Sequence, residues 1–105
     1  MNKTTLKALK GSIKKWEGVA AGKLQDRGAT NCPLCVEFMS SAFGHCVGCP
    51  VRGKTGKDFC QHTPYWKWVR GTTYSREDDS GRTANTAKQK ELAKAELKFL
   101  KSLLP

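Results

Sequence analysis

The chain has 105 residues, of which 38% are hydrophobic and 27% are charged, and it holds five cysteines. This length leaves room for one small domain, residues 1–105, and such a small core gains from a further cross-link. The apolar stretches are too short for a membrane-spanning helix, and the lysine-rich N-terminus lacks the apolar segment of a secretory signal. We therefore expect a cytoplasmic protein whose cysteines stay reduced.

The chain is strongly basic: nineteen lysines and arginines oppose nine acidic residues, a formal net charge of +10. The net charge is +5 over residues 1–27, +1 over 28–63 and +4 over 64–105, so the excess lies on the two flanks. This distribution favours a polyanionic partner, nucleic acid first and an acidic protein surface second, and we expect no membrane partner. A solvated surface that only keeps the chain soluble would give the same counts.

Residues 4–20 predict an amphipathic helix that Thr4 or Thr5 can cap and that Gly22 ends. Apolar residues recur at every third or fourth position, at Leu6, Leu9, Ile13, Trp16 and Ala20. Four lysines lie off this stripe and are predicted to face solvent or the phosphates of a nucleic acid: Lys7, Lys10, Lys14 and Lys15.

The cysteines follow the pattern Cys-x2-Cys-x10-Cys-x2-Cys-x10-Cys from position 32 to position 60. Each Cys-x2-Cys pair forms a tight turn, and two such turns can point four thiolates at one tetrahedral ion. Because a reducing cytoplasm disfavours disulfides, the spacing predicts one structural zinc ion. The simplest set of ligands is Cys32, Cys35, Cys46 and Cys49.

One tetrahedral zinc cannot take five thiolates, so the ligand set stays open. Cys60 can replace Cys46 or Cys49, and His62 can take one corner, whereas His45 is predicted to lie beside the site or on the surface. Four thiolates would also hold an iron–sulfur cluster, but the chain shows no partner for electron transfer. A redox-active Cys-x2-Cys is disfavoured because the pairs are too close together for a thioredoxin-like setting.

The segments between the cysteines predict little regular structure. Residues 36–43 predict a short helix with Phe38, Met39, Ala42 and Phe43 on its apolar side, and residues 50–57 predict a polar loop. Gly48 to Thr55 matches the phosphate-loop pattern Gly-x4-Gly-Lys-Thr, but no strand precedes it and no α/β domain surrounds it. We therefore expect no nucleotide hydrolysis.

Residues 60–70 form the most aromatic stretch. Aromatic and cationic side chains alternate there, at Tyr65, Trp66, Lys67, Trp68 and Arg70. This pattern is typical of surfaces on which bases of single-stranded nucleic acid stack. We also expect at least one of the two tryptophans to close the small core instead.

The last predicted helix spans about residues 84–104 and starts at Thr83 or Asn85, after a polar loop that contains the acidic run 77–79. Its apolar residues can pack on the N-terminal helix or pair two copies of the chain as a homodimer. One side carries Leu92, Ala95, Phe99 and Leu103, widened by Leu97, Leu100 and Leu104. Lysines cover the rest, at Lys88, Lys90, Lys94, Lys98 and Lys101.

Five segments, 9–16, 31–35, 46–50, 63–65 and 99–105, resemble those of a family of small cysteine-rich proteins encoded by tailed bacteriophages and prophages. The resemblance spans nearly the whole chain, with a gap at about residues 71–90. It implies the cytoplasm of an infected bacterium as the setting, and it implies no catalytic residues. Small basic phage proteins commonly bind DNA or RNA, or block a host enzyme or defence system.

Together these patterns predict a small α-rich (α+β), zinc-stabilised domain whose cysteine-rich core, about residues 31–70, is flanked by two amphipathic helices. The expected function is binding to nucleic acid through the basic helices and the aromatic segment. The alternative is a protein-binding inhibitor or adaptor of a host enzyme or bacterial defence system. We do not expect an enzyme, because neither histidine has the glutamate of a zinc deaminase and no pair of carboxylates stands out.

Overall fold

Helices make up most of the described chain. A computed structural model describes residues 1–38, 48–56, 63–75 and 81–105. The predicted helical character is confirmed, whereas no strand of the predicted α+β fold is found in these ranges; extended pairing there is limited to isolated bridges between Asp26 and Arg82 and between Ser75 and Gly81. In chain order the elements are α1 (Lys3–Ala20), the 3-10 helix η1 (Gly28–Asn31), α2 (Pro33–Phe38), α3 (Pro50–Thr55), α4 (Pro64–Gly71) and α5 (Ala87–Lys101).

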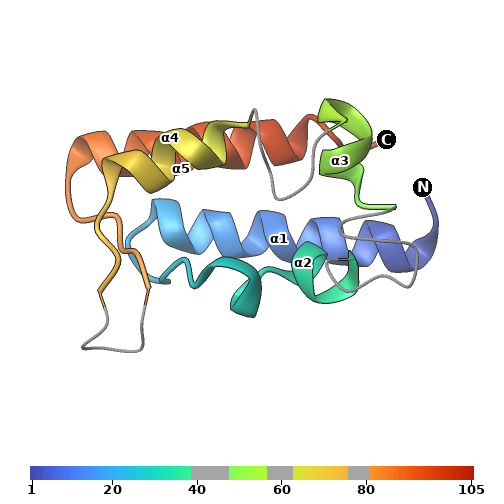
Figure 1. The fold of residues 1–105 in the computed structure, drawn as a ribbon, viewed down its shortest axis with the longest axis horizontal. Helices are drawn as coiled ribbons and strands as arrows, with labels where there is room; N and C mark the ends of the chain where they lie inside the picture. Colours follow the sequence, from blue (N-terminus) through green and yellow to red (C-terminus); the bar gives the residue numbers. More distant parts are fainter. Residues whose placement is uncertain (39–47, 57–62, 76–80) are drawn as a thin grey trace.

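The two long helices, α1 and α5, lie side by side and run in opposite directions, so the two chain ends lie at the same end of the molecule (Figure 1). α4 packs on α5, and α2 packs on α1. The core lies between these helices, and its largest fully buried side chains include Leu9, Val19 and Trp68. The terminal helices, predicted to flank the middle of the chain, therefore contact each other directly.

α1 forms where the sequence predicts it, one residue longer at its start. Its cap is Asn2 rather than Thr4 or Thr5: the Asn2 side chain accepts a hydrogen bond from the Thr5 backbone N–H over 2.8 Å. Beyond the helix end, Gly22 adopts a positive φ of 76°, which glycine tolerates without steric cost. The predicted stripe largely faces the core, with Leu9, Ile13, Trp16 and Ala20 buried.

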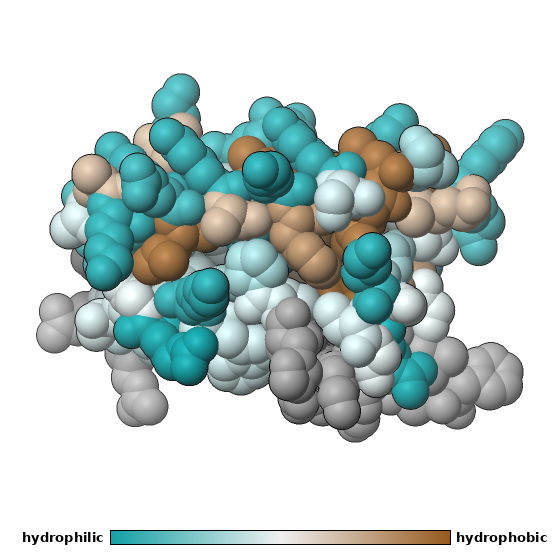
Figure 2. All heavy atoms as spheres, turned by 90° about the horizontal axis from the view of Figure 1, so that it is seen from above, coloured by the Kyte–Doolittle hydropathy of each residue, from teal (hydrophilic) through white to brown (hydrophobic). Residues whose placement is uncertain are grey.

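α5 is shorter than the predicted range of 84–104. It begins after Thr86, because Thr86 and Gln89 form a capping box in which each side chain accepts a backbone N–H from the other end of the turn. Its apolar side packs against α1 and α4, so the predicted packing on the N-terminal helix is formed. Hydrophilic side chains gather along the outer side of α5 (Figure 2).

The predicted apolar face of α5 is turned by about one position. Ala95 is exposed, contrary to the prediction, whereas Ala93, Glu96 and Leu100 are buried. α5 contacts both α1 and α4, so the side chains that point between these two helices are the buried ones. Three of the predicted leucines and Phe99 contribute from the edges as partly buried side chains, at Leu92, Leu97, Phe99 and Leu103. Leu104, also predicted on the apolar side, is exposed.

Two short helices differ from the prediction. The polar loop expected at 50–57 is instead α3, which starts with Pro50 at its first position and ends before Gly56, whose φ is 71°. Proline is favoured in the first turn of a helix and glycine just after its end, so these two residues mark a helix that the polar composition concealed. α2 starts at Pro33, earlier than predicted, and residues 39–43 of the predicted helix lie outside the described residues.

Candidate functional site

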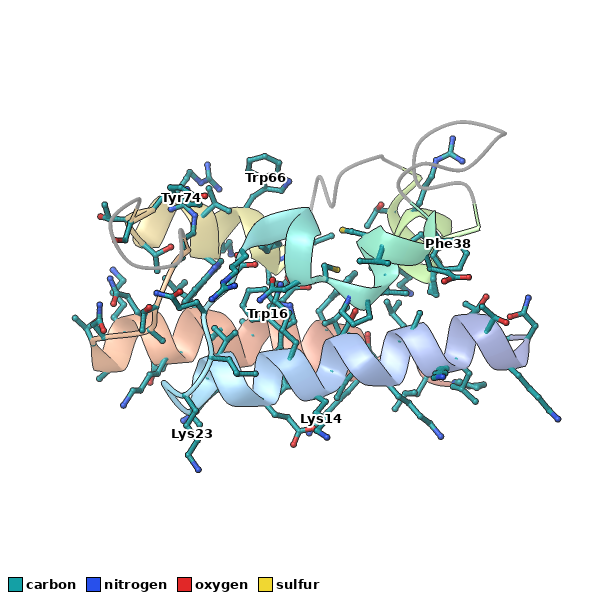
Figure 3. The ribbon with its side chains drawn as sticks, turned by 90° about the horizontal axis from the view of Figure 1, so that it is seen from below. Lys14, Trp16, Lys23, Phe38, Trp66 and Tyr74 are labelled. Atoms are coloured by element: carbon teal, nitrogen blue, oxygen red, sulfur yellow. The ribbon has the colours of Figure 1, made fainter. Side chains whose placement is uncertain are left out.

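Three of the four lysines predicted on α1 are exposed: Lys7, Lys10 and Lys14. Together with exposed Lys3 they recur every three or four residues, so all four side chains lie on one face of α1. We call these four residues the α1 lysine row. Lys14 points to the side of the molecule opposite Trp66 and Tyr74 (Figure 3).

Lys15 does not belong to this surface, and its predicted role in binding phosphate is wrong. Its side chain is 6% exposed, and its ammonium lies 2.8 Å from the Asp26 carboxylate, which is itself 1% exposed. Successive residues of an α-helix are rotated by about 100°, so Lys15 faces the core although Lys14, one residue earlier, faces solvent. Lys15 therefore forms a buried ion pair, a structural role.

Asp26 holds together three parts of the chain. Besides Lys15, it accepts hydrogen bonds from the Trp68 indole N–H over 3.0 Å and from the Gly28 backbone N–H over 2.9 Å. Burial alone would raise the pKa of Asp26, but the Lys15 charge and these hydrogen bonds outweigh it and lower the pKa. Trp68 is fully buried, so it closes the core, as expected for one tryptophan, and its predicted alternative of stacking on bases is wrong.

Glu96 is a second buried carboxyl in the same core. Its side chain comes from α5, and within the described residues its Oε2 atom has no hydrogen-bond partner. Burial raises the pKa of Glu96 to about 7, with further contributions from the charges of Cys32 and Asp26. A proton on this carboxyl is therefore favoured by the folded chain.

Two predicted zinc ligands, Cys32 and Cys35, lie at the start of α2. The Cys35 backbone N–H donates to the Cys32 sulfur over 3.4 Å, and the Ser12 hydroxyl lies 3.8 Å from that sulfur. A hydrogen bond from the Cys35 side chain lowers the pKa of the Cys32 thiol to about 6, and the Lys15 charge acts in the same direction. Cys32 is thus set up as a thiolate, the form that binds metal.

The remaining predicted ligands are only partly covered by the structure. Cys49 is buried at the N-cap of α3, whereas Cys46, Cys60, His62 and His45 lie outside the described residues. Among the side chains that the structure describes, no three cysteine, histidine or acidic residues come together as a group of metal ligands. The zinc ion and its ligand set remain predictions.

The rest of the aromatic segment forms α4, which Thr63 caps by accepting a hydrogen bond from the Tyr65 backbone N–H. Tyr65 is half-buried, and its ring packs edge to face against Trp16, with ring centres 5.9 Å apart. Trp66 is exposed, as are the predicted contacts Lys67 and Arg70. Four of the five predicted residues of this segment thus remain at least partly accessible.

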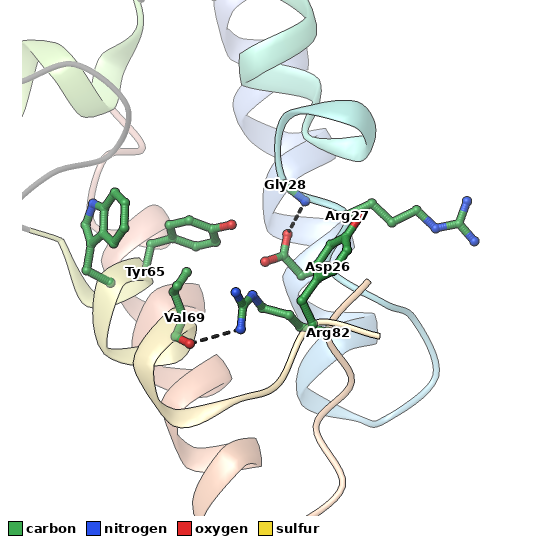
Figure 4. Close-up of a pocket in the computed structure, with 8 residues that line it drawn as sticks. Asp26, Arg27, Gly28, Tyr65, Val69 and Arg82 are labelled. Carbon is green, nitrogen blue, oxygen red and sulfur yellow. Dashed lines mark hydrogen bonds between the residues drawn. The ribbon is translucent and has the colours of Figure 1, made fainter. Parts of the chain in front are cut away.

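A pocket of about 250 Å³ opens beside Trp66, and we call it the Trp66 pocket (Figure 4). Arg82 is fixed in its wall, because its guanidinium donates to the backbone oxygens of Val69 and Thr72 over 3.0 and 2.6 Å. The Arg82 guanidinium also lies 5.9 Å from the centre of the Tyr74 ring. The lining residues are Asp26, Arg27, Gly28, Tyr65, Trp66, Val69, Tyr74 and Arg82.

Sequence reasoning missed Asp26, Glu96, Tyr74 and Arg82. A signal did exist for the burial of Lys15, which lies three residues after Ser12 and four before Val19, both buried. No local pattern marks Arg82, because it reaches the pocket through its backbone bridge to Asp26.

Comparison of this chain with protein-family models, with curated proteins and with solved structures finds no match. The resemblance to phage proteins therefore stays a prediction. No helix in the described ranges is both long and apolar enough to cross a membrane. The chemistry of the exposed side chains is what remains to indicate a function.

Proposed function

We propose that this protein binds nucleic acid through its exposed basic side chains and acts by binding rather than by catalysis. One observation carries the proposal: within the described ranges, exposed cations far outnumber exposed acids. The exposed acids are Glu17, Glu37 and Glu91. The exposed cations are Lys3, Lys7, Lys10, Lys14, Lys23, Arg27, Lys54, Lys67, Arg70, Lys88, Lys90, Lys94, Lys98 and Lys101.

The burial of Glu96 strengthens this imbalance, whereas the burial of Asp26 is matched by that of Lys15. Both carboxyls lie in the core, where Asp26 pairs with Lys15 and burial raises the pKa of Glu96 to about 7. Neither acid therefore weakens the positive field outside the molecule as an exposed carboxylate would. Within the described residues, the burial of Glu96 therefore removes an acid from the surface without removing a cation.

The α1 lysine row has the form of a phosphate-binding surface. It follows one face of an 18-residue helix, opposite the face that packs in the core. Within the described residues, none of its four lysines has an ion pair that would have to be broken on binding. Each lysine that neutralises a phosphate releases a counterion from the nucleic acid, which makes the affinity depend steeply on salt.

The first prediction concerns this salt dependence. Replacing Lys3, Lys7, Lys10 and Lys14 with Gln is expected to reduce the slope of log affinity against log salt by up to about 3 to 4 for duplex DNA. The measurement is fluorescence anisotropy of a labelled 16-base-pair duplex and of a single strand of the same sequence, titrated from low to physiological salt.

Two variants serve as controls for the lysine row. Replacing the same four residues with Arg keeps the charge and should keep the slope, whereas replacing Lys90, Lys94, Lys98 and Lys101 with Gln removes the same charge from α5. An unchanged slope in the α1 Gln variant would mean that the row does not touch phosphate. If neither Gln variant changes binding, or if no binding occurs at low salt, the alternative of a protein-binding inhibitor takes precedence.

We further propose that one zinc ion stabilises the middle of the chain, with Cys32, Cys35, Cys46 and Cys49 as ligands. The hydrogen bond from the Cys35 N–H to the Cys32 sulfur supports this, because such donors stabilise a metal-binding thiolate. Such a site would link α2 to α3, two short helices of six residues each.

The second prediction tests the zinc ligands by native mass spectrometry of the purified protein. The unaltered chain is expected to carry one zinc, and Cys32→Ser and Cys35→Ser are expected to lose it and to unfold at a lower temperature. Cys60→Ser is the matched control and should retain the ion. If Cys60→Ser loses zinc while Cys46→Ser or Cys49→Ser retains it, Cys60 is a ligand in place of that cysteine. If all five single cysteine variants retain zinc, the proposed zinc site is refuted.

A further inference from the structure

Trp66 is the one tryptophan of the chain that a ligand can reach. The chain has three, and Trp16 and Trp68 are buried at 3% and 0% exposure, whereas Trp66 is 39% exposed. Tyr74, another exposed aromatic residue that lines the Trp66 pocket, lies on the same side of the molecule (Figure 3). Two exposed aromatic rings around a pocket favour a flat, aromatic ligand.

The polar groups of the pocket are held in fixed positions before any ligand arrives. The Val69 and Thr72 oxygens orient the Arg82 guanidinium, and the Asp26 carboxylate already serves Lys15, Gly28 and Trp68. Because Lys15 offsets the charge of Asp26, the Arg82 guanidinium leaves the described lining of the pocket net positive, whereas the Arg27 side chain points away from the pocket (Figure 4). An aromatic ring attached to an anion suits these surroundings.

The volume of the pocket narrows the class of ligand. At about 250 Å³ it lies below the roughly 300–1,000 Å³ of pockets that enclose drug-sized molecules. Gly28 lies opposite Tyr65, with an added Cβ atom 4.0 Å from the Tyr65 hydroxyl, so a side chain there would narrow the space further. One heterocyclic ring fits such a pocket better than a complete nucleotide cofactor.

We propose that the Trp66 pocket takes one unpaired base of single-stranded nucleic acid, stacked on the Trp66 indole. The inference rests on the proposed nucleic-acid binding and adds the class of ligand, a strand whose bases are free to leave the stack. In a duplex the bases are stacked and paired, so none can enter the pocket without being extruded. Single-stranded DNA and RNA share this chemistry.

Cations for the adjoining phosphates come from α4 itself. Arg70 lies four residues after Trp66, about 6 Å along the helix and on the same face, and Lys67 directly follows Trp66; both are exposed. Lys14 of the α1 lysine row lies on the opposite side of the molecule (Figure 3), and the other three lysines share its face of α1. The pocket is therefore a second contact surface, which can be tested without altering the row.

The third prediction compares oligomers of equal charge with and without bases. The probes are dT8, U8 and an eight-residue abasic deoxyribose-phosphate oligomer, and binding is followed by tryptophan fluorescence and by anisotropy of an end label. The unaltered chain is expected to bind dT8 or U8 about tenfold more tightly than the abasic oligomer, in keeping with one stacked base, and base-containing strands should quench its emission. The difference between dT8 and U8 shows which strand the pocket prefers.

Trp66→Ala is expected to bind dT8 and U8 only as weakly as the unaltered chain binds the abasic oligomer. Trp66→Phe keeps an aromatic ring and should keep most of the preference for strands that contain bases. Val36→Ala, which shortens an exposed apolar side chain outside the pocket, is the control and should change nothing. Equal binding of dT8, U8 and the abasic oligomer by the unaltered chain, or an undiminished preference in Trp66→Ala, overturns the pocket but leaves the proposed function intact. Absence of binding to every oligomer and to duplex DNA at low salt overturns both.

Discussion

Replacing Lys15 with Met is expected to lower the free energy of unfolding by about 3–5 kcal/mol at pH 7. The substitution keeps the length of the side chain but removes the cation 2.8 Å from Asp26, and it leaves a carboxylate buried without a compensating charge. Urea denaturation followed by circular dichroism measures the loss. Lys14→Met, one residue earlier and exposed, is the matched control and should change stability by no more than about 0.5 kcal/mol.

The pH dependence of this loss has a definite sign. The pKa of Asp26 is lowered in the folded chain, so the ion pair stabilises the fold above the ordinary aspartate pKa, and the stabilisation disappears as pH falls through the lowered value. The difference between the Lys15→Met chain and the unaltered chain should therefore be largest near neutral pH and shrink below about pH 4.

A double variant separates the charge from the packing. Combining Lys15→Met with Asp26→Asn removes both charges and should restore part of the stability lost in the single variant. The recovery is incomplete, because an amide has one acceptor oxygen for the two hydrogen bonds that Gly28 and Trp68 now donate to separate carboxylate oxygens. Equal stability of the Lys15 and Lys14 variants would contradict the structural role of Lys15.

The long helices could be predicted from sequence because their signal is local. Apolar residues at every third or fourth position place α1 to within one residue and locate most of α5. The errors concern their ends and their exact facing. The caps are Asn2 and Thr86, each of which accepts a backbone N–H of the first turn. The sequence predicts Thr4 or Thr5 for the first helix and Thr83 or Asn85 for the last, because all of these side chains can cap a helix.

The site was less predictable because its parts come together only in the tertiary structure. Lys14 and Lys15 are identical in chemistry and adjacent in sequence, yet one is exposed and the other pairs with Asp26 from the following loop. Trp66 and Trp68 differ in the same way: the Trp68 indole N–H donates to the buried Asp26 carboxylate, whereas the Trp66 side chain is exposed. A pattern of residue types gives the candidates, and packing divides them between core and surface.

Replacing Glu96 with Gln is expected to stabilise the folded chain increasingly as the pH rises. The pKa of Glu96 is raised from its ordinary value to about 7, so folding is most favourable below the ordinary value, where the carboxyl is protonated in both states. Above the ordinary glutamate pKa, the unfolded chain loses this proton, whereas the folded chain must either keep it or bury a charged carboxylate. Either requirement lowers the stability of the folded chain. Stability supplied by the proton is lost as pH rises through about 7.

Gln cannot ionise, so its advantage over Glu96 should grow by about 2 kcal/mol between pH 5 and pH 8. Urea denaturation of both chains at several pH values, with the metal content held equal because Cys32 contributes to the shift, measures this difference. Glu91→Gln, an exposed glutamate on the same helix, should show a nearly constant difference over the same range. A constant difference for Glu96→Gln as well would mean that its carboxyl ionises freely in the folded chain, and that water reaches the core between α1, α4 and α5.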